Sequence, residues 1–183
     1  MANSSPYAGI VLAAGSGKRF GGPKAPFVYE GERLVDRSVN LMRSANLDPV
    51  IVVLGAWQGD VPDCEVVINP NFEDGLGSSL VAGITYLQEH HRQSPGAIVT
   101  LVDLPALNRT SVELVRDHPG SLVQAQFNGQ PGHPVKIDGA HWDALLAELA
   151  GDVGAKQFLR SNNAVALPLQ DPGTIFDLDT NPN

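Results

Sequence analysis

The stretch LAAGSGKRFGGPK, residues 12–24, holds four glycines and three cations in thirteen positions. It directly follows the apolar run YAGIV at residues 7–11, which is typical of a buried strand. Glycines let backbone N–H groups approach an anion closely, and the neighbouring Lys and Arg side chains add positive charge. We therefore expect a first strand that leads directly into an anion-binding loop.

Short apolar runs alternate with amphipathic segments along the rest of the chain. The expected strands span residues 8–14, 49–55, 65–69, 97–103, 121–127 and 164–169. The expected helices carry apolar stripes, which are Val35, Val39 and Met42, then Leu80, Ile84 and Leu87, then Trp142, Leu145, Leu146 and Leu149. A shorter helix is expected to begin with TSVE at residues 110–113, which has the spacing of a capping box. The alternation predicts a three-layer α/β fold, in which helices cover both faces of a mainly parallel, twisted sheet.

Composition and charge narrow the class of ligand. The chain has 183 residues, 43% of them hydrophobic, which predicts a single domain over residues 1–183. Its net charge of −8 disfavours nucleic acid and anionic membranes as partners. The charge is uneven, however, because no Asp or Glu precedes Glu30, while Lys18, Arg19 and Lys24 all fall in that stretch. A positive loop on an acidic protein suits a small anionic ligand.

Cys64 is the single cysteine, so the chain can form neither an internal disulfide nor a cysteine-based zinc site. The N-terminal segment MANSSPYAG lacks the basic and apolar regions of a signal peptide, and no apolar run approaches the length of a membrane span. We therefore expect a cytoplasmic protein.

The glycine loop can be compared with known phosphate-binding patterns. A Walker loop requires G-x-x-x-x-G-K followed by Ser or Thr, but Leu12 stands at the first glycine position and Arg19 follows Lys18. The dinucleotide fingerprint G-x-G-x-x-G fits Gly15 and Gly17, but Phe20 takes its third glycine position. A degenerate form of this second pattern stays open.

A third pattern fits in full, since the loop resembles the nucleotidyltransferase signature L-A-A-G-x-G-x-R-x-G-x-x-K. The matching residues are Leu12, Ala13, Ala14, Gly15, Gly17, Arg19, Gly21 and Lys24. Later segments extend the resemblance, in order NPNFEDGLGSSLVAGI (69–84), LVDLP (101–105), GHPV (132–135), GDVGAK (151–156) and DLDT (177–180). Together they resemble the molybdopterin nucleotidyltransferase family, in its cytidylyltransferase-like branch. The resemblance implies a Rossmann-like nucleotidyltransferase fold.

The resemblance also implies a reaction, which is Mg²⁺-dependent transfer of a nucleoside monophosphate to molybdopterin or a similar phosphorylated small molecule. CTP is the implied donor and pyrophosphate the leaving product. A direct in-line transfer needs no covalent enzyme intermediate, so no nucleophilic Ser or Cys is expected. The implied acceptor is a phosphorylated pterin, and a molybdoenzyme is the implied transient partner.

The family pattern assigns roles to individual residues. Arg19 and Lys24 would offset charge on the triphosphate. The backbone of the loop would bind the nucleotide through Leu12, Ala13, Ala14, Gly15 and Gly17. Asp103 and Asp179 would hold Mg²⁺, and Asp177 would support them. The nucleotide would be contacted by Ser78 and Ser79, and the acceptor would be faced by His133 and Asp152. Asp103 also follows from its position, because open α/β sheets bind ligands at the carboxyl ends of their strands.

Structural roles compete with several of these assignments. Ser78 and Ser79 stand where a helix is expected to begin, so either could be its N-cap. Capping of the following helix is the safer interpretation of Asp152, and a lone histidine such as His133 is more often structural. Three other functions remain, namely a sugar-phosphate nucleotidyltransferase, an NAD(P)H-binding oxidoreductase that uses the glycine loop, and a cofactor chaperone without turnover.

Overall fold

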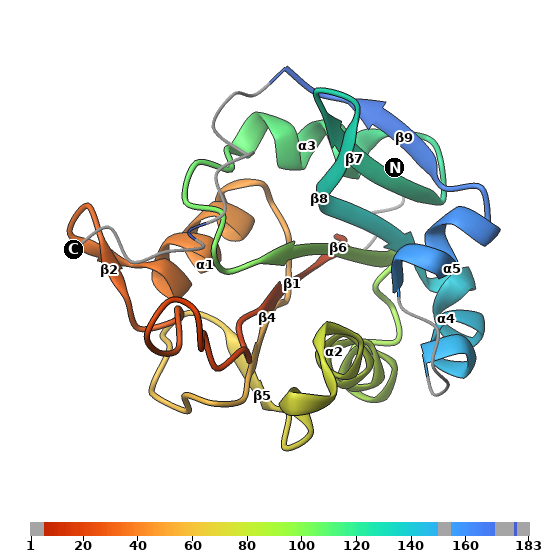
Figure 1. Cartoon of the computed structure of the whole chain (residues 1–183). Coiled ribbons are helices and arrows are strands. Elements are labelled where there is room, and N and C mark those ends of the chain that lie inside the picture. The colour runs from red at the N-terminus through yellow and green to blue at the C-terminus, as the bar shows by residue number, and fades with distance from the viewer. Residues whose placement is uncertain (1–5, 150–154, 171–177, 179–183) are drawn as a thin grey trace.

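The computed structural model describes residues 6–149, 155–170 and 178, and its centre is a seven-stranded sheet. The strand order across the sheet is β5-β4-β1-β6-β8-β7-β9 (Figure 1). The strands are β1 (Ala8–Leu12), β4 (Val50–Leu54), β5 (Glu65–Ile68), β6 (Gly96–Leu101), β7 (Leu122–Phe127), β8 (Gln130–Asp138) and β9 (Val165–Pro168). Every neighbouring pair is parallel except the two pairs that β8 makes with β6 and β7. The expected mainly parallel α/β sheet is confirmed.

Helices cover both faces of this sheet, as Figure 1 shows. One face carries α1 (Leu34–Ser44) and α3 (Arg109–Asp117), and the other carries α2 (Leu76–His90), α4 (Trp142–Leu149) and α5 (Ala155–Ser161). All five residues of β1 are buried, because this strand lies between both helical layers. Its side chains alternate, with Ile10 and Leu12 in the cluster under α2 and Val11 in the cluster under α1.

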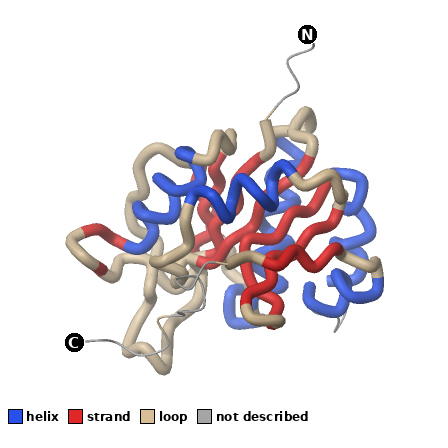
Figure 2. Tube along the Cα trace, turned by 90° about the horizontal axis from the view of Figure 1, so that it is seen from above, coloured by secondary structure: helices blue, strands red, loops and turns tan. Residues whose placement is uncertain are grey.

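Short elements complete the fold. A small hairpin of β2 (Val28–Tyr29) and β3 (Glu32–Arg33) precedes α1, and the 3₁₀ turns η1 (Phe72–Asp74) and η2 (Gly139–His141) precede α2 and α4. Seen from above, the strands form one twisted layer with helices around it, and long loops gather at one side (Figure 2). Within the described residues, no helix combines the length and the hydropathy needed to cross a membrane.

The strand order creates a crevice beside β1. The chain runs from β1 to β4 and β5 on one side, then returns to place β6 on the other side of β1. Leu12 at the end of β1 is thus paired with both Val53 of β4 and Leu101 of β6. The chain leaves β1 for α1 on one face of the sheet and leaves β5 for α2 on the other face. This change of face beside β1 is the arrangement that makes a ligand site in open α/β sheets.

Two details of the secondary structure differ from the sequence prediction. Strand β8 was not expected, because its segment QPGHPVKID contains two prolines and a glycine, which usually interrupt strands. The capping box at residues 110–113 was wrong as the start of a helix. The N-cap of α3 is instead Asn108, whose side-chain oxygen accepts a hydrogen bond from the backbone N–H of Ser111 at 2.9 Å.

A buried lysine joins β8 to the end of α3. Lys136 is 4% exposed, and its ammonium donates to the carbonyls of Arg116 at 3.1 Å and His118 at 2.7 Å. The ammonium also lies 4.7 Å from the ring centroid of Tyr7. A cation suits this place, because the last carbonyls of a helix carry partial negative charge.

We expect Lys136→Met to destabilise the protein by about 1–3 kcal/mol, since it removes the buried ammonium that donates to two part-buried carbonyls while keeping most of the side-chain volume. Urea unfolding followed by circular dichroism measures this difference. Lys18→Met is the matched control, because Lys18 is exposed, and its effect should stay within about 0.5 kcal/mol. Equal stability of the two variants would show that the Lys136 ammonium contributes nothing.

Candidate active site

The glycine loop is held in a tight fold by one carbonyl. The oxygen of Gly17 accepts hydrogen bonds from the backbone N–H groups of Phe20 at 2.9 Å, Gly21 at 2.9 Å and Gly22 at 3.1 Å. Gly17 has a φ of +59°, and a Cβ at this position would lie 1.8 Å from the carbonyl oxygen of Gly22. Only glycine fits there, so the loop geometry depends directly on the second glycine of the motif.

This loop forms one wall of a cavity of about 560 Å³ at the carboxyl ends of β1 and β6. The cavity is lined by three segments that are distant in the sequence. These are the loop residues Leu12, Ala13, Ala14, Gly15, Ser16, Gly17, Lys18, Arg19, Phe20 and Lys24, the segment after β5 with Phe72, Glu73, Gly75, Leu76 and Ser79, and the end of β6 with Leu101, Val102 and Asp103. We call it the loop cavity. It brings together the predicted loop residues, Ser79 and Asp103.

An ion pair closes the loop cavity between the two strand ends. Lys24 Nζ lies 2.8 Å from Asp103 Oδ2, and the two side chains are 15% and 19% exposed. The second carboxylate oxygen, Asp103 Oδ1, is buried and has no hydrogen-bond partner within the described part of the chain. The backbone carbonyl of Asp103 accepts from the N–H of Leu178 at 3.3 Å, which brings one residue of the DLD segment beside this strand end.

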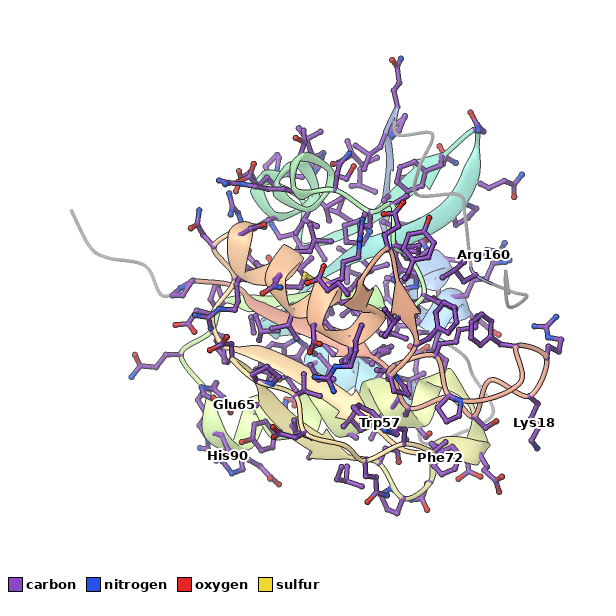
Figure 3. All side chains as sticks on the ribbon, turned by 90° about the vertical axis from the view of Figure 1, so that its left-hand side faces the viewer. Lys18, Trp57, Glu65, Phe72, His90 and Arg160 are labelled. Atoms are coloured by element: carbon purple, nitrogen blue, oxygen red, sulfur yellow. The ribbon has the colours of Figure 1, made fainter. Side chains whose placement is uncertain are left out.

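The other two cations of the loop lie farther out. Lys18 and Arg19 are exposed, and Figure 3 shows Lys18 at the outer end of its loop, extending into solvent. Both residues still line the loop cavity. Positive charge is therefore present both at the inner end of the cavity, on Lys24, and at its rim.

A second cavity of about 1260 Å³ adjoins the first and shares Leu12 and Leu76 with it. We call it the wide cavity. Its wall includes His133, Gln124, Asn69, Ser78 and Lys156, from β8, β7, the segment after β5, α2 and α5. The structure thus places His133 beside the wide cavity and not in the loop cavity.

The protonation of His133 follows from its surroundings. Burial lowers the pKa of His133 below its ordinary value, so the imidazole is neutral at pH 7. Its Nδ1 lies 3.3 Å from the carbonyl oxygen of Val99. A carbonyl only accepts, so Nδ1 carries the hydrogen and Nε2 is left as a hydrogen-bond acceptor.

The two serines of α2 are not N-caps, because the helix begins at Leu76 and its N-cap is Gly75. Ser78 and Ser79 lie in the first turn, with Ser78 beside the wide cavity and Ser79 beside the loop cavity. The start of a 15-residue helix between the two cavities adds a positive dipole end, which favours an anion there.

Three predicted residues, Asp152, Asp177 and Asp179, lie outside the described residues. Among the cavity residues that the sequence did not single out, the structure places Phe72 in the loop cavity and Lys156 in the wide cavity. Both belong to segments quoted for their family resemblance, NPNFEDGLGSSLVAGI and GDVGAK. The resemblance was therefore the signal that could have located them.

A glycine loop after the first strand, with a carboxylate at the end of the adjacent strand, defines a nucleotide-binding protein of the α/β class. Residues 9–166 match the family described as the MobA-like NTP transferase domain, and the chain belongs to this family. It is a nucleotidyltransferase by that membership, as the resemblance of its loop predicted.

Two curated relatives carry different names. The chain is 33% identical over 192 residues to the nicotine blue oxidoreductase of Paenarthrobacter nicotinovorans, covering 94% of this chain and 91% of that protein. It is 44% identical over 57 residues to a protein of Opitutus terrae named "Probable molybdenum cofactor guanylyltransferase", covering 31% of this chain and 28% of that protein.

Solved structures share the fold. The crystal structure of Rv0371c from Mycobacterium tuberculosis superposes with a TM-score of 0.81 at 23% identity, covering 97% of this chain and 94% of that chain. A structure of Rv0371c in complex with manganese gives a TM-score of 0.71 at 21% identity, covering 91% and 88%. At these identities the likeness establishes the fold alone.

We expect Gly17→Ala to weaken nucleotide binding about tenfold or more, because the added Cβ displaces the Gly22 carbonyl and the positive φ is strained by about 1–3 kcal/mol. Isothermal titration calorimetry with each nucleoside triphosphate measures the change. Gly139→Ala is the control, because Gly139 lines neither cavity and a Cβ there would meet only backbone atoms of Pro95 and Ser94, none closer than 3.4 Å, so the nucleotide affinity should be unchanged. Unaltered binding by a folded Gly17→Ala variant would remove the loop from the nucleotide site.

Proposed function

We propose that this protein transfers CMP from CTP to a phosphorylated pterin, of which molybdopterin is the first candidate, and releases pyrophosphate. The observation that carries the proposal is the pair of adjoining cavities at the carboxyl edge of the sheet. The loop cavity offers charged groups for a triphosphate, and the wide cavity offers a larger, partly apolar space for an acceptor. The relative named for molybdenum cofactor guanylyl transfer supports a pterin acceptor.

The reaction transfers one nucleotidyl group from the triphosphate to the acceptor phosphate. An acceptor phosphate oxygen attacks the α-phosphorus in line, a new P–O bond forms, and the bond from the α-phosphorus to its bridging oxygen breaks. The bridging oxygen leaves with pyrophosphate and takes the electron pair. Arg19 and Lys24 would offset the charge that develops on the leaving group, and Ser79 would contact the nucleotide. Catalysis is then positioning and charge stabilisation by groups already in place.

Asp103 fits the role of a metal ligand. Its Oδ1 is a buried carboxylate oxygen with no partner in the described part of the chain, and such oxygens suit Mg²⁺ or Mn²⁺. When bound, a divalent cation would supply positive charge beside the triphosphate. No group of three or more His, Cys, Asp or Glu gathers among the described residues. Asp179 remains our proposed second ligand, supported by the contact between Leu178 and Asp103.

We assign the acceptor to the wide cavity. His133 presents a neutral ring with Nε2 as an acceptor, and the exposed Lys156 offers a cation for the acceptor phosphate. Asp152 precedes Lys156 in the GDVGAK segment and stays a proposed acceptor contact. We further propose that residues 1–183 act as one domain and that a molybdoenzyme receives the product.

The direct test is pyrophosphate release from each of the four nucleoside triphosphates in the presence of Mg²⁺, with and without isolated molybdopterin. Release that requires molybdopterin supports the proposal. Release with a sugar phosphate in place of molybdopterin would instead support a sugar-phosphate nucleotidyltransferase.

We expect Lys24→Ala and Asp103→Asn each to lower turnover by at least about 100-fold, a loss comparable to removing one preorganised electrostatic group. Asp103→Asn keeps the shape of the side chain, so its effect isolates the charge. Steady-state rates of pyrophosphate release measure both variants, and circular dichroism checks that each is folded.

Arg92→Ala is the control for these two variants, because Arg92 lies away from both cavities and donates to the carbonyl of Gln88. Its turnover should equal that of the unaltered protein. Near-normal turnover by a folded Lys24→Ala variant would overturn the assignment of the loop cations.

The donor base depends on Ala14. The guanylyl branch of the family typically has L-A-G-G where this chain has Leu12-Ala13-Ala14-Gly15, and the added methyl group favours the smaller pyrimidine. One methyl group is worth about 1–3 kcal/mol of discrimination. We therefore expect kcat/KM for CTP to exceed that for GTP by about tenfold or more, and Ala14→Gly to narrow the gap. Side-by-side rates with one acceptor test this, and a preference for GTP would contradict it.

A second activity is favoured by one observation, which is the 33% identity to the nicotine blue oxidoreductase. It would use the loop cavity for a nicotinamide dinucleotide in place of a triphosphate. Titration with NADH under fluorescence detection separates the two activities. Tight NADH binding that CTP does not displace would favour the oxidoreductase, whereas no binding would remove it.

A further inference from the structure

The amide of Asn69 lies beside the wide cavity and contacts one serine of each cavity. Asn69 directly follows β5 and is 3% exposed. Its backbone N–H donates to the carbonyl of Leu54 at 2.8 Å, which attaches it to the end of β4. Because a buried amide needs hydrogen-bond partners, the question is which groups the Asn69 side chain contacts.

Every side-chain group of Asn69 has a partner. Oδ1 accepts from the backbone N–H of Asn71 at 2.9 Å, and Nδ2 donates to Ser78 Oγ at 2.9 Å and to Ser79 Oγ at 3.0 Å. The partner of Oδ1 is a donor only, so the oxygen must face Asn71 and the nitrogen must face the serines. The orientation of the amide is thus fixed by its neighbours.

The fixed amide sets the direction of the serine hydroxyl hydrogens. Ser78 Oγ accepts from Asn69 and has the carbonyls of Asn71 and Gly75, each at 2.8 Å, for its own hydrogen. Ser79 Oγ also accepts from Asn69, but no acceptor for its hydrogen is found among the described residues. Ser79 lines the loop cavity, so its hydroxyl is arranged to donate to an acceptor atom there.

We propose that Asn69 is a positioning residue that makes Ser79 a hydrogen-bond donor to the nucleotide, and this rests on the function proposed above. A base carbonyl, a ribose oxygen or a phosphate oxygen can accept this bond. The same amide also donates to Ser78, which lines the wide cavity, so one side chain contacts a serine of each cavity.

The test is a double-mutant cycle on Asn69 and Ser79, with CTP affinity in Mg²⁺ measured by isothermal titration calorimetry. Asn69→Asp has the same shape but presents an oxygen to Ser79, which draws the hydroxyl hydrogen away from the cavity. Ser79→Ala removes the donor itself. Each single variant should raise Kd about five- to tenfold, the usual effect of one hydrogen bond.

In the Ser79→Ala background, Asn69→Asp should change Kd by less than about twofold if Asn69 acts through Ser79. A full effect of Asn69→Asp in that background would overturn the proposal and indicate a general structural role. Wild-type affinity of Ser79→Ala would also overturn it, whatever the fate of the Asn69 variants. Should Asn69→Asp fail to fold, Asn69→Ala completes the cycle without introducing a charge.

Asn128→Asp is the matched control, because Asn128 is exposed in the turn between β7 and β8 and should leave the CTP affinity unchanged. The unaltered protein separates this inference from the proposed function. If it binds CTP and the cycle shows no coupling, only the positioning role of Asn69 fails. If it binds no nucleoside triphosphate, the proposed function fails and the positioning role falls with it.

Discussion

The pair of Lys24 and Asp103 is the interaction on which the arrangement of the site depends. It joins the loop after β1 to the end of β6, the parallel strand beside it. Both side chains are mostly buried, so separating them without new partners would leave two poorly solvated charges. The same two groups are the cation and the carboxylate that we propose for nucleotidyl transfer. On this proposal, one ion pair both fixes the loop and holds two groups of the site in place.

The fold was largely predictable because its central strands are short apolar runs buried on both faces. The runs at residues 8–14, 49–55 and 97–103 became β1, β4 and β6, which form the middle of the sheet. Strand β8 escaped prediction because its prolines suggested a loop, and only the neighbours β6 and β7 make a strand of it. The burial of Lys136 could not be predicted from the sequence, because the carbonyls that accept from its ammonium lie 18 and 20 residues away in the chain.

The site was predictable where a local pattern encodes it and not where tertiary contacts create it. The glycine loop, Lys24 and Asp103 belong to short motifs that predict an anion-binding loop and a carboxylate at a strand end. The division of Ser78 and Ser79 between two cavities was not, because it depends on where the first turn of α2 meets Asn69. The wide cavity was equally hidden, since its wall combines residues from β5 to α5.

The width of the loop cavity is set by backbone atoms, which explains why one scaffold can serve several reactions. A Cβ on Gly55 would lie 2.7 Å from the carbonyl oxygen of Ala14 and 2.7 Å from Phe72, so these three residues already touch as closely as they can. The carbonyl of Ala14 is also held by the N–H of Ala56 at 3.0 Å. This wall of the loop cavity is thus closely packed backbone and ring, whereas side chains from β1, β5, β6, β7, β8, α2, α4 and α5 line the wide cavity. With the acceptor in the wide cavity, as we propose, substitutions there would change the acceptor without disturbing the loop, which fits relatives that carry names as different as an oxidoreductase and a guanylyltransferase.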